Sequence, residues 1–278
     1  MKMKRSGRLV DMTRYLLTHP NTIISLTRFT ERYESAKSSI SEDLNIINEC
    51  FERQGVGKLV TLAGAAGGVK YLPFVKKEAA EAFLHRLGET LSDPGRLLPG
   101  GYLYMTDVLG DPSIVNEIGR LIASIFIHKP IDVVMTMETK GIPIAYATAS
   151  QLNVPVVIVR RSSKVTEGST VSMNYVSGSS KRIQSMVLPR RSLRPGANVL
   201  ILDDFMKAGG TMKGMMNLIK EFDARPVGAA VLMETKDAEH KLVNDYVSLL
   251  RLEELDENGS LSVEIGNYFN YYGEDDAS

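Results

Sequence analysis

The chain has 278 residues, of which 44% are hydrophobic, so it is long enough for one or two domains with sizeable cores. Its single cysteine, Cys50, excludes an internal disulfide and a cysteine-rich metal site, and without a long apolar segment we expect a cytoplasmic protein. The formal net charge of +0 hides an asymmetry: residues 1–74 contain 11 Lys and Arg against 7 Asp and Glu and the rest is acidic, which indicates a polyanionic partner for the N-terminal part.

Residues 1–74 predict a winged helix-turn-helix domain. Apolar residues at helical spacing indicate helices at about 9–17 and 26–33 and a third helix with an apolar face over 40–51. Two short apolar runs, 59–62 and 69–72, flank a glycine-rich turn and predict a β-hairpin. Three helices followed by a hairpin, the wing, are typical of a DNA-binding domain.

The third predicted helix has the features of a recognition helix. Ser39 and Glu42 have capping-box spacing, and Lys37, Ser38 and Ser41 lie on the polar face near the helix start, where they suit contacts to phosphates and base edges. The residues predicted to contact double-stranded DNA are Lys2, Arg5, Arg8, Lys37, Ser38, Ser41, Lys58 and Lys70. A helical protein-interaction domain with a solvated basic face is the alternative, and RNA is disfavoured because no aromatic stacking platform is present.

Strands alternate with helices in residues 75–278, which predicts a second domain with a mostly parallel α/β sheet. The crevice at the carboxyl ends of such strands is the expected ligand site. The expected elements are a helix at 76–91, a turn at 98–101, a helix from 113, a strand at 131–136, a helix at 141–152, and strands at 154–159, 199–203 and 227–233.

The clearest chemistry lies in residues 199–211. Four branched apolar residues indicate a buried strand that ends in Asp203 and Asp204, and a turn with Gly209 and Gly210 leads into a helix. Glycines let backbone N–H groups approach an anion, and the helix N-terminus adds partial positive charge. The two carboxylates suit sugar hydroxyls or a cation that bridges to phosphates.

This stretch resembles the 5-phosphoribosyl-1-pyrophosphate (PRPP) motif of type I phosphoribosyltransferases. The resemblance implies that the acids bind the ribose hydroxyls, that Ala208 to Thr211 bind the 5′-phosphate, and that the loop at 139–141 contacts pyrophosphate. Lys207 and Ala208 depart from the Ala-Thr that is usual in the enzymes. The effector-binding residues expected are Asp203, Asp204, Lys207, Ala208, Gly209, Gly210, Thr211, Tyr102, Phe205, Thr139, Lys140 and Gly141.

A long polar segment at 160–182 combines cations and hydroxyls beside this proposed pocket. We expect it to form a mobile flap, with Arg160, Lys164 and Glu167 as the residues that approach the ligand. In the phosphoribosyltransferases the corresponding region is the flexible loop. A solvated charged hairpin is the alternative.

Nearly the whole chain resembles the purine operon repressors of low-GC Gram-positive bacteria. The stretches that carry the resemblance are 5–8, 36–43, 98–102, 164–170 and 203–211. It implies a homodimeric repressor of purine synthesis and salvage genes that requires no cofactor. Bound PRPP, with Mg²⁺, would weaken operator binding, and guanine-nucleotide alarmones would compete, with Tyr102 and Phe205 as base-stacking partners.

No catalytic residue is predicted, because the sequence offers no group that would position and deprotonate a nucleobase, and no metal site is expected. A sensor needs only different effector affinities in its DNA-competent and DNA-incompetent states. Two alternatives remain: an active purine phosphoribosyltransferase with an extra N-terminal domain, and an RNA-binding attenuation protein of the pyrimidine-regulator kind.

Overall fold

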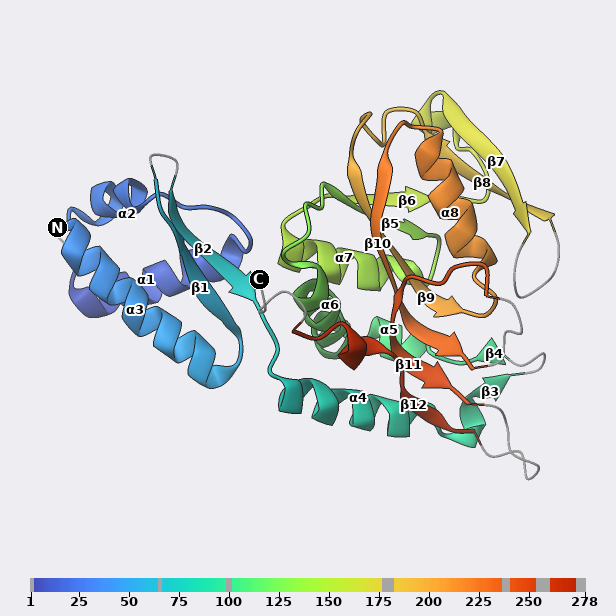
Figure 1. Ribbon diagram of the computed structural model, residues 1–278, viewed down its shortest axis with the longest axis horizontal. Helices are drawn as coiled ribbons and strands as arrows, with labels where there is room; N and C mark the ends of the chain where they lie inside the picture. The colour runs from blue at the N-terminus through green and yellow to red at the C-terminus, as the bar shows by residue number, and fades with distance from the viewer. Residues whose placement is uncertain are drawn as a thin grey trace.

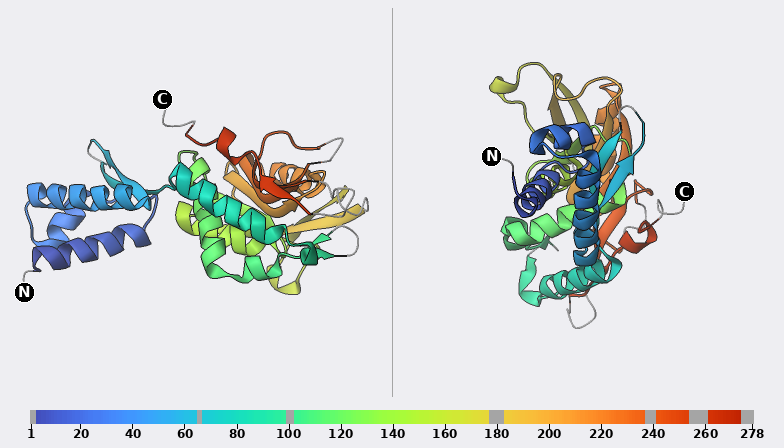
Figure 2. Two further views of the ribbon diagram at one scale, coloured as in Figure 1. Left: turned by 90° about the horizontal axis from the view of Figure 1, so that it is seen from below. Right: turned by 90° about the vertical axis from the view of Figure 1, so that its left-hand side faces the viewer.

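The computed structural model describes residues 3–64, 67–98, 102–176, 183–236, 241–253 and 261–273. It consists of two lobes, which are separate in Figure 1 and in the left view of Figure 2 and are joined by a short connection ahead of α4. We call residues 3–73 the head and residues 77–273 the body.

The head is a winged helix-turn-helix, as predicted. Its elements are α1 (Arg5–Thr18), α2 (Leu26–Tyr33), α3 (Lys37–Gln54), β1 (Gly57–Leu62) and β2 (Gly68–Pro73). The two strands are antiparallel, and Ile24 adds a bridge to Val69. The three helices pack around a core of their own that includes Met12, Phe29 and Ile40, which are completely buried. The head therefore has the hydrophobic core that a separate domain needs.

Helix α3, the predicted recognition helix, begins earlier than the capping-box spacing of Ser39 and Glu42 indicates. Ala36 is the N-cap residue and supplies no side-chain hydrogen bond, and Lys37 is the first helical residue. The predicted capping box at Ser39 and Glu42 is therefore wrong, because both residues lie inside the first turns of the helix. The earlier start places Lys37 and Ser38 in the first turn, both exposed.

The body is built on one six-stranded sheet. The helices, the strands and the three 3₁₀ turns (η) of the body are, in chain order, α4 (Lys77–Leu91), η1 (Pro94–Arg96), β3 (Leu97–Leu98), β4 (Tyr102–Leu103), α5 (Thr106–Gly110), α6 (Pro112–Phe126), β5 (Val133–Met137), α7 (Gly141–Leu152), β6 (Val156–Val159), η2 (Val165–Glu167), β7 (Thr170–Val176), β8 (Ile183–Pro189), β9 (Asn198–Met206), α8 (Gly210–Lys220), β10 (Arg225–Thr235), β11 (Val247–Leu252), β12 (Val263–Ile265) and η3 (Tyr268–Asn270). The strand order is β12-β11-β10-β9-β5-β6, and every neighbouring pair is parallel except β11 and β12. The mostly parallel α/β sheet is confirmed.

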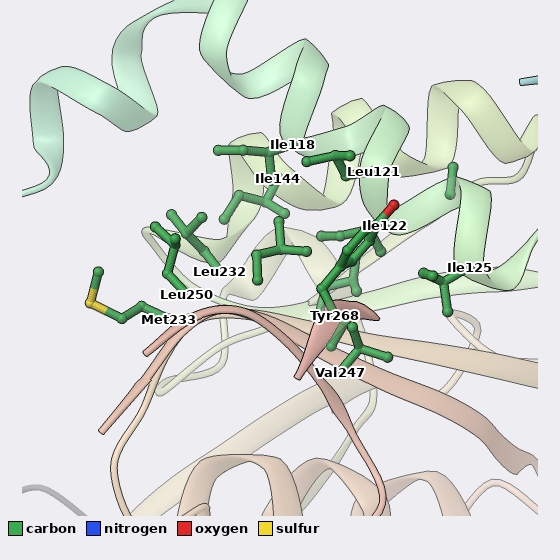
Figure 3. Packing of buried hydrophobic residues seen from close by; sticks show 14 of the residues in the cluster. Ile118, Leu121, Ile122, Ile125, Ile144, Leu232, Met233, Val247, Leu250 and Tyr268 are labelled. Atoms are coloured by element: carbon green, nitrogen blue, oxygen red, sulfur yellow. The ribbon is translucent and has the colours of Figure 1, made fainter. Parts of the chain in front are cut away.

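Two hydrophobic clusters cover the two faces of this sheet. Figure 3 shows isoleucines and leucines of α6 and Ile144 of α7 packed over β10, β11 and Tyr268. The other cluster joins the sheet to α8 through Met212, Met215 and Leu218. Within the described residues, no helix is both long and apolar enough to span a membrane.

Two segments differ from the expectation. β9 continues past Asp203 to Met206, because it stays paired with β10 up to Met206 although its pairing with β5 ends at Leu202. The predicted flap is only partly a loop: residues 170–176 form β7, which pairs with β8 in an antiparallel hairpin. The alternative of a hairpin therefore describes this part better. Residues 177–182 lie outside the described residues, as do 99–101 of the predicted turn.

Candidate effector site and DNA-binding face

The acid pair lies where β9 passes the end of β5. Asp203 is 8% exposed and Asp204 is half-buried, and the backbone N–H of Asp204 donates to Oδ1 of Asp203 at 3.0 Å. Burial raises the pKa of both carboxyls, and the neighbouring charge of Asp204 raises the pKa of Asp203 further. Both groups therefore gain from a ligand that brings hydrogen-bond donors or a cation.

The N-terminus of α7 directly adjoins this pair. A Cβ built on Gly141 would lie 2.2 Å from Oγ1 of Thr136 and 3.3 Å from Oδ1 of Asp203. Only glycine permits that approach, since real Cβ atoms are not found so close to a neighbouring atom. Thr139 and Lys140, in the loop before the helix, are exposed. The predicted loop is thus beside the acids, with an open helix N-terminus.

The N-terminus of α8 forms the second anion-binding position. Gly209 is its N-cap residue with a left-handed backbone (φ +79°), a conformation that favours glycine. Gly210 is buried, Ala208 and Thr211 are half-buried, and Lys207 is exposed. The predicted phosphate loop therefore leads from the acid pair into a helix N-terminus.

Two cations act on the acid pair: Lys140, which was predicted, and Arg161, which lies in the predicted 160–182 segment but was not among the residues expected to approach the ligand. Lys140 lowers the pKa of Asp204, against the larger effect of burial, and Arg161 does the same for Asp203. The backbone N–H of Arg161 donates to Oε1 of Glu138 at 2.8 Å, so Glu138 ties the start of the 160s segment to the loop before α7. The sequence signal for Arg161 was its place in the cationic segment 160–182, and the signal for Glu138 was its position directly before Thr139.

Arg160 is not part of a mobile flap. Its backbone N–H and carbonyl exchange hydrogen bonds with Val187 at 3.0 and 2.8 Å, and its guanidinium lies 3.4 Å from Oε2 of Glu138. Lys164 is exposed, and the side chain of Glu167 lies outside the described part. An isolated bridge to Val187 therefore holds the backbone of Arg160, which contradicts the predicted mobile loop at this residue, and its approach to the ligand stays a prediction.

The two predicted stacking residues have different settings. Phe205 is half-buried in β9 and packs against the core cluster shared with α6 and α7. The backbone of Tyr102 belongs to β4, but its side chain lies outside the described residues. Stacking on either ring stays a prediction.

The arrangement suits a sugar that carries phosphate groups at two positions. Two helix N-termini supply N–H donors for anions, and the carboxylates between them accept hydrogen bonds from hydroxyls. Among the described residues there is no group of three or more His, Cys, Asp or Glu side chains placed to hold a metal ion. A bridging cation would therefore take its remaining oxygen ligands from the phosphates and water.

The residues predicted to contact DNA do not all lie exposed on one face of the head. Lys37 and Ser38 are exposed in the first turn of α3, and the hydroxyl of Ser41 donates to the carbonyl of Lys37 at 3.0 Å. Lys70 is half-buried in the middle of the hairpin. Lys58 lies at the hairpin base, where its ammonium is 5.8 Å from the ring centroid of Phe74. Lys58 pairs with Leu72, which is next to the last residue of β2, so it lies near the connection to the body.

Arg8 does not present its charge to solvent. It is 7% exposed, and its Nε donates to Oδ2 of the fully buried Asp43 at 2.5 Å. Arg5 shares Asp43 through a bond of 2.9 Å, although half of its side chain remains exposed. The expectation for Arg8 is wrong, because a buried carboxylate on α3 requires a cation from α1. Lys2 lies outside the described residues.

The end of α7 opposite the acid pair contacts the head. The side-chain amide of Asn21 donates to the carbonyl of Leu152 at 3.2 Å, and that of Asn153 donates to Oγ1 of Thr22 at 2.8 Å. We call this pair of contacts the joint. A neighbouring contact comes from α6, whose Arg120 donates to the carbonyl of Gly55 at 3.2 Å. Gly55 is the C-cap residue of α3, the predicted recognition helix.

The comparisons with known proteins agree with this two-part architecture. The N-terminal family of bacterial purine repressors matches residues 4–73, and the phosphoribosyl transferase domain family matches residues 105–263. The purine biosynthesis transcriptional repressor PurR of Bacillus subtilis (strain 168) is 59% identical over 273 residues, which cover 98% of this chain and 96% of that protein. The chain belongs to the PurR family.

Members of the PurR family carry two different descriptions. The PurR of Lactococcus lactis subsp. lactis (strain IL1403), 49% identical over 96% of this chain and 99% of its own length, is a purine biosynthesis transcriptional activator. Among solved structures, adenine phosphoribosyltransferase from Rhodothermus marinus shares the body fold, with a TM-score of 0.53 and 22% identity over 62% of this chain and 99% of that chain.

Proposed function

We propose that the protein is a DNA-binding transcriptional regulator of purine synthesis and salvage genes whose operator affinity is weakened by PRPP bound in the body. The observation that carries this proposal is the pair Asp203 and Asp204 between two helix N-termini, in the same chain as a winged helix-turn-helix head. The similarity to PurR proteins over nearly the whole chain supports it.

PRPP matches the site group by group. Its 5′-phosphate fits the N-terminus of α8 at 208–211, its 2′- and 3′-hydroxyls fit Asp203 and Asp204, and its pyrophosphate fits residues 139–141 before α7. Burial and the neighbouring charge of Asp204 raise the pKa of Asp203, and the hydroxyls and an accompanying Mg²⁺ would offset both effects by stabilising the ionised carboxylates. Guanine-nucleotide alarmones compete for the same phosphate positions, with Tyr102 and Phe205 as the rings for the base.

The site acts as a sensor in this proposal, and the protein is not an enzyme. Phosphoribosyl transfer requires a bound base as nucleophile and stabilisation of the charge that develops at the ribose and on the departing pyrophosphate. Binding requires neither. Lys207 and Ala208, at the positions where the phosphoribosyltransferases usually have Ala-Thr, are consistent with relaxed demands on the phosphate loop.

Helix α7 supplies a physical connection between the pocket and the head. Its 12 residues span about 18 Å, from Gly141 beside Asp203 to Leu152 and Asn153 at the joint. It also packs tightly on α6, because a Cβ on Gly119 would lie 2.6 Å from Ala147. A ligand that shifts the start of α7 would therefore act on the joint directly and on the Arg120–Gly55 bond through α6. A coupling of about 1–3 kcal/mol would change DNA affinity by about 5–150-fold.

Repression is the proposed direction because the B. subtilis relative, at 59% identity, is a repressor. The L. lactis relative shows that a PurR protein also activates, so the sign is tested by transcription in vitro from a purine promoter. We expect a homodimer on double-stranded operator DNA. If the protein reduces transcription and Mg-PRPP restores it, the result supports repression. If the protein stimulates transcription, the proposed repressor is instead an activator.

Two assays separate the proposal from its alternatives. The phosphoribosyl transferase match favours an enzyme as the second candidate, for which pyrophosphate release from PRPP is measured with adenine, guanine, hypoxanthine or xanthine. We expect no turnover, and clear turnover would reject the sensor. Binding to labelled operator duplex is compared with binding to the transcript of the same region. Preference for the RNA would reject the DNA-binding role of the head.

A further inference from the structure

A buried charged cluster lies behind the phosphate loop, outside the residues assigned to the effector. Its centre is Glu234, near the end of β10, which is only 2% exposed. Its carboxylate accepts hydrogen bonds from Lys241, from the hydroxyl of Tyr246, from Ser248 at 2.7 Å, and from Arg251 at 3.4 Å. Lys241 also donates to the Tyr246 hydroxyl at 2.7 Å.

The cluster holds Glu234 in its charged form. Burial alone would raise the pKa of its carboxyl, but the hydrogen bonds from Lys241, Tyr246 and Ser248 outweigh burial and lower that pKa. An ionised carboxylate in this position accepts strong bonds from its partners. Lys241 and Tyr246 are thereby fixed at the two ends of residues 241–246, which we call the clamp segment.

The clamp segment contacts the phosphate loop between its two anchors. The backbone N–H of Leu242 donates to the carbonyl of Ala208 at 3.0 Å. Val243 is buried against the loop, since a Cβ built on Gly209 would lie 3.6 Å from Cγ2 of Val243. Gly209 is also the residue whose left-handed backbone starts α8. The clamp segment thus supports the loop at the turn that aims its N–H groups.

We propose that Glu234, Lys241 and Tyr246 are positioning residues for the 5′-phosphate: by anchoring the clamp segment they hold residues 208–211 in the shape that binds a sugar phosphate. This inference rests on the proposed effector site. Binding loops lose affinity when their supporting contacts are left loose, because the ligand must then order the loop itself. The cluster touches neither residues 139–141 nor the acid pair in the bonds described above, so its effect is confined to one end of the ligand.

The test uses ligands that report on the two ends separately. Calorimetric titrations of the full-length protein measure PRPP, ribose 5-phosphate and inorganic pyrophosphate, each with Mg²⁺. We expect Tyr246→Phe and Lys241→Met to weaken PRPP and ribose 5-phosphate by about five- to tenfold, the loss expected for a broken supporting hydrogen bond. Pyrophosphate affinity should not change, and Lys241→Arg should restore part of the loss.

Tyr268→Phe is the matched control, because the hydroxyl of this fully buried tyrosine bonds to Ser124 at 3.1 Å, on the core face beside α6. It should leave all three affinities unchanged. Wild-type affinity for ribose 5-phosphate in both clamp variants would overturn the inference. An equal loss for pyrophosphate would overturn it too, since that indicates general loosening. If the wild-type protein binds no PRPP, the proposed function fails first and the inference fails with it.

Discussion

The joint between α7 and the head can be opened without disturbing the backbone. Asn21 and Asn153 both have left-handed backbones, with φ of +52° and +57°. Glycine adopts this conformation freely, so Asn21→Gly and Asn153→Gly remove the side-chain amides and leave the turns unstrained. Alanine would add strain at the same positions and confuse the result.

The expected size follows from the two bonds that are lost. The Asn21 bond is partly buried and the Asn153 bond is exposed, and a net contribution of about 0.5–1.5 kcal/mol is typical of one intramolecular hydrogen bond. The double variant therefore removes about 1–3 kcal/mol, which is as large as a typical coupling free energy between two sites. We expect the factor by which Mg-PRPP weakens operator binding to fall to within about threefold of unity. Binding of Mg-PRPP in the absence of DNA should stay within about threefold of wild type, since the pocket lies at the other end of α7.

Fluorescence anisotropy on labelled operator duplex, with and without Mg-PRPP, measures this factor. Asp223→Gly is the matched control, because Asp223 also has a left-handed backbone (φ +54°) but lies in the turn between α8 and β10. It should respond to PRPP as the wild-type protein does. If the double variant is folded and keeps the full PRPP response, the two bonds of the joint do not couple the pocket to the head.

Further expectations concern the acids and the head. Asp204→Ala should leave operator binding intact and remove most of the PRPP response; loss of DNA binding in a folded variant would show that the pocket is not a separate sensor. Lys37→Ala should lower the slope of log affinity against log salt by about one, with PRPP affinity unchanged; an unchanged slope would exclude a phosphate contact. Arg8→Ala should destabilise the head by about 3 kcal/mol in urea denaturation because Asp43 is left buried with a weaker partner; a near-neutral effect would contradict the buried pair. Burial raises the pKa of Asp203 above its value in the unfolded chain, so the folded state binds the proton more tightly. The stability of the ligand-free protein should therefore rise as pH falls through that raised pKa. Thermal melts at several pH values should show this rise, and Asp203→Asn should flatten it.

Periodic apolar residues predicted most of the elements, because each helix or strand must place one face in a core. The helix expected at 141–152 has those bounds in the structure, and the helix expected at 76–91 begins one residue later. The start of α3 was missed because Ala36 caps it without a side-chain bond. The end of β9 was missed because its ladder with β10 outlasts its ladder with β5, a difference that depends on strand order.

The site could be predicted where its residues are contiguous in the chain. Asp203 to Thr211 form one strand–turn–helix, so their spacing alone indicated an anion site beside two carboxylates. Contacts between distant residues left no such trace. Arg8 and Asp43 are 35 positions apart, and the two bonds of the joint each span 131 positions. Such pairs form through tertiary packing, which periodicity does not describe.

Calorimetric measurement of Mg-PRPP affinity, with the free protein and with the protein saturated by operator duplex, tests the central claim most directly. Linked binding is reciprocal, so DNA should weaken PRPP binding by the same factor by which PRPP weakens DNA binding, about 5–150-fold. Equal PRPP affinity in the two states would mean that the body does not communicate with the head.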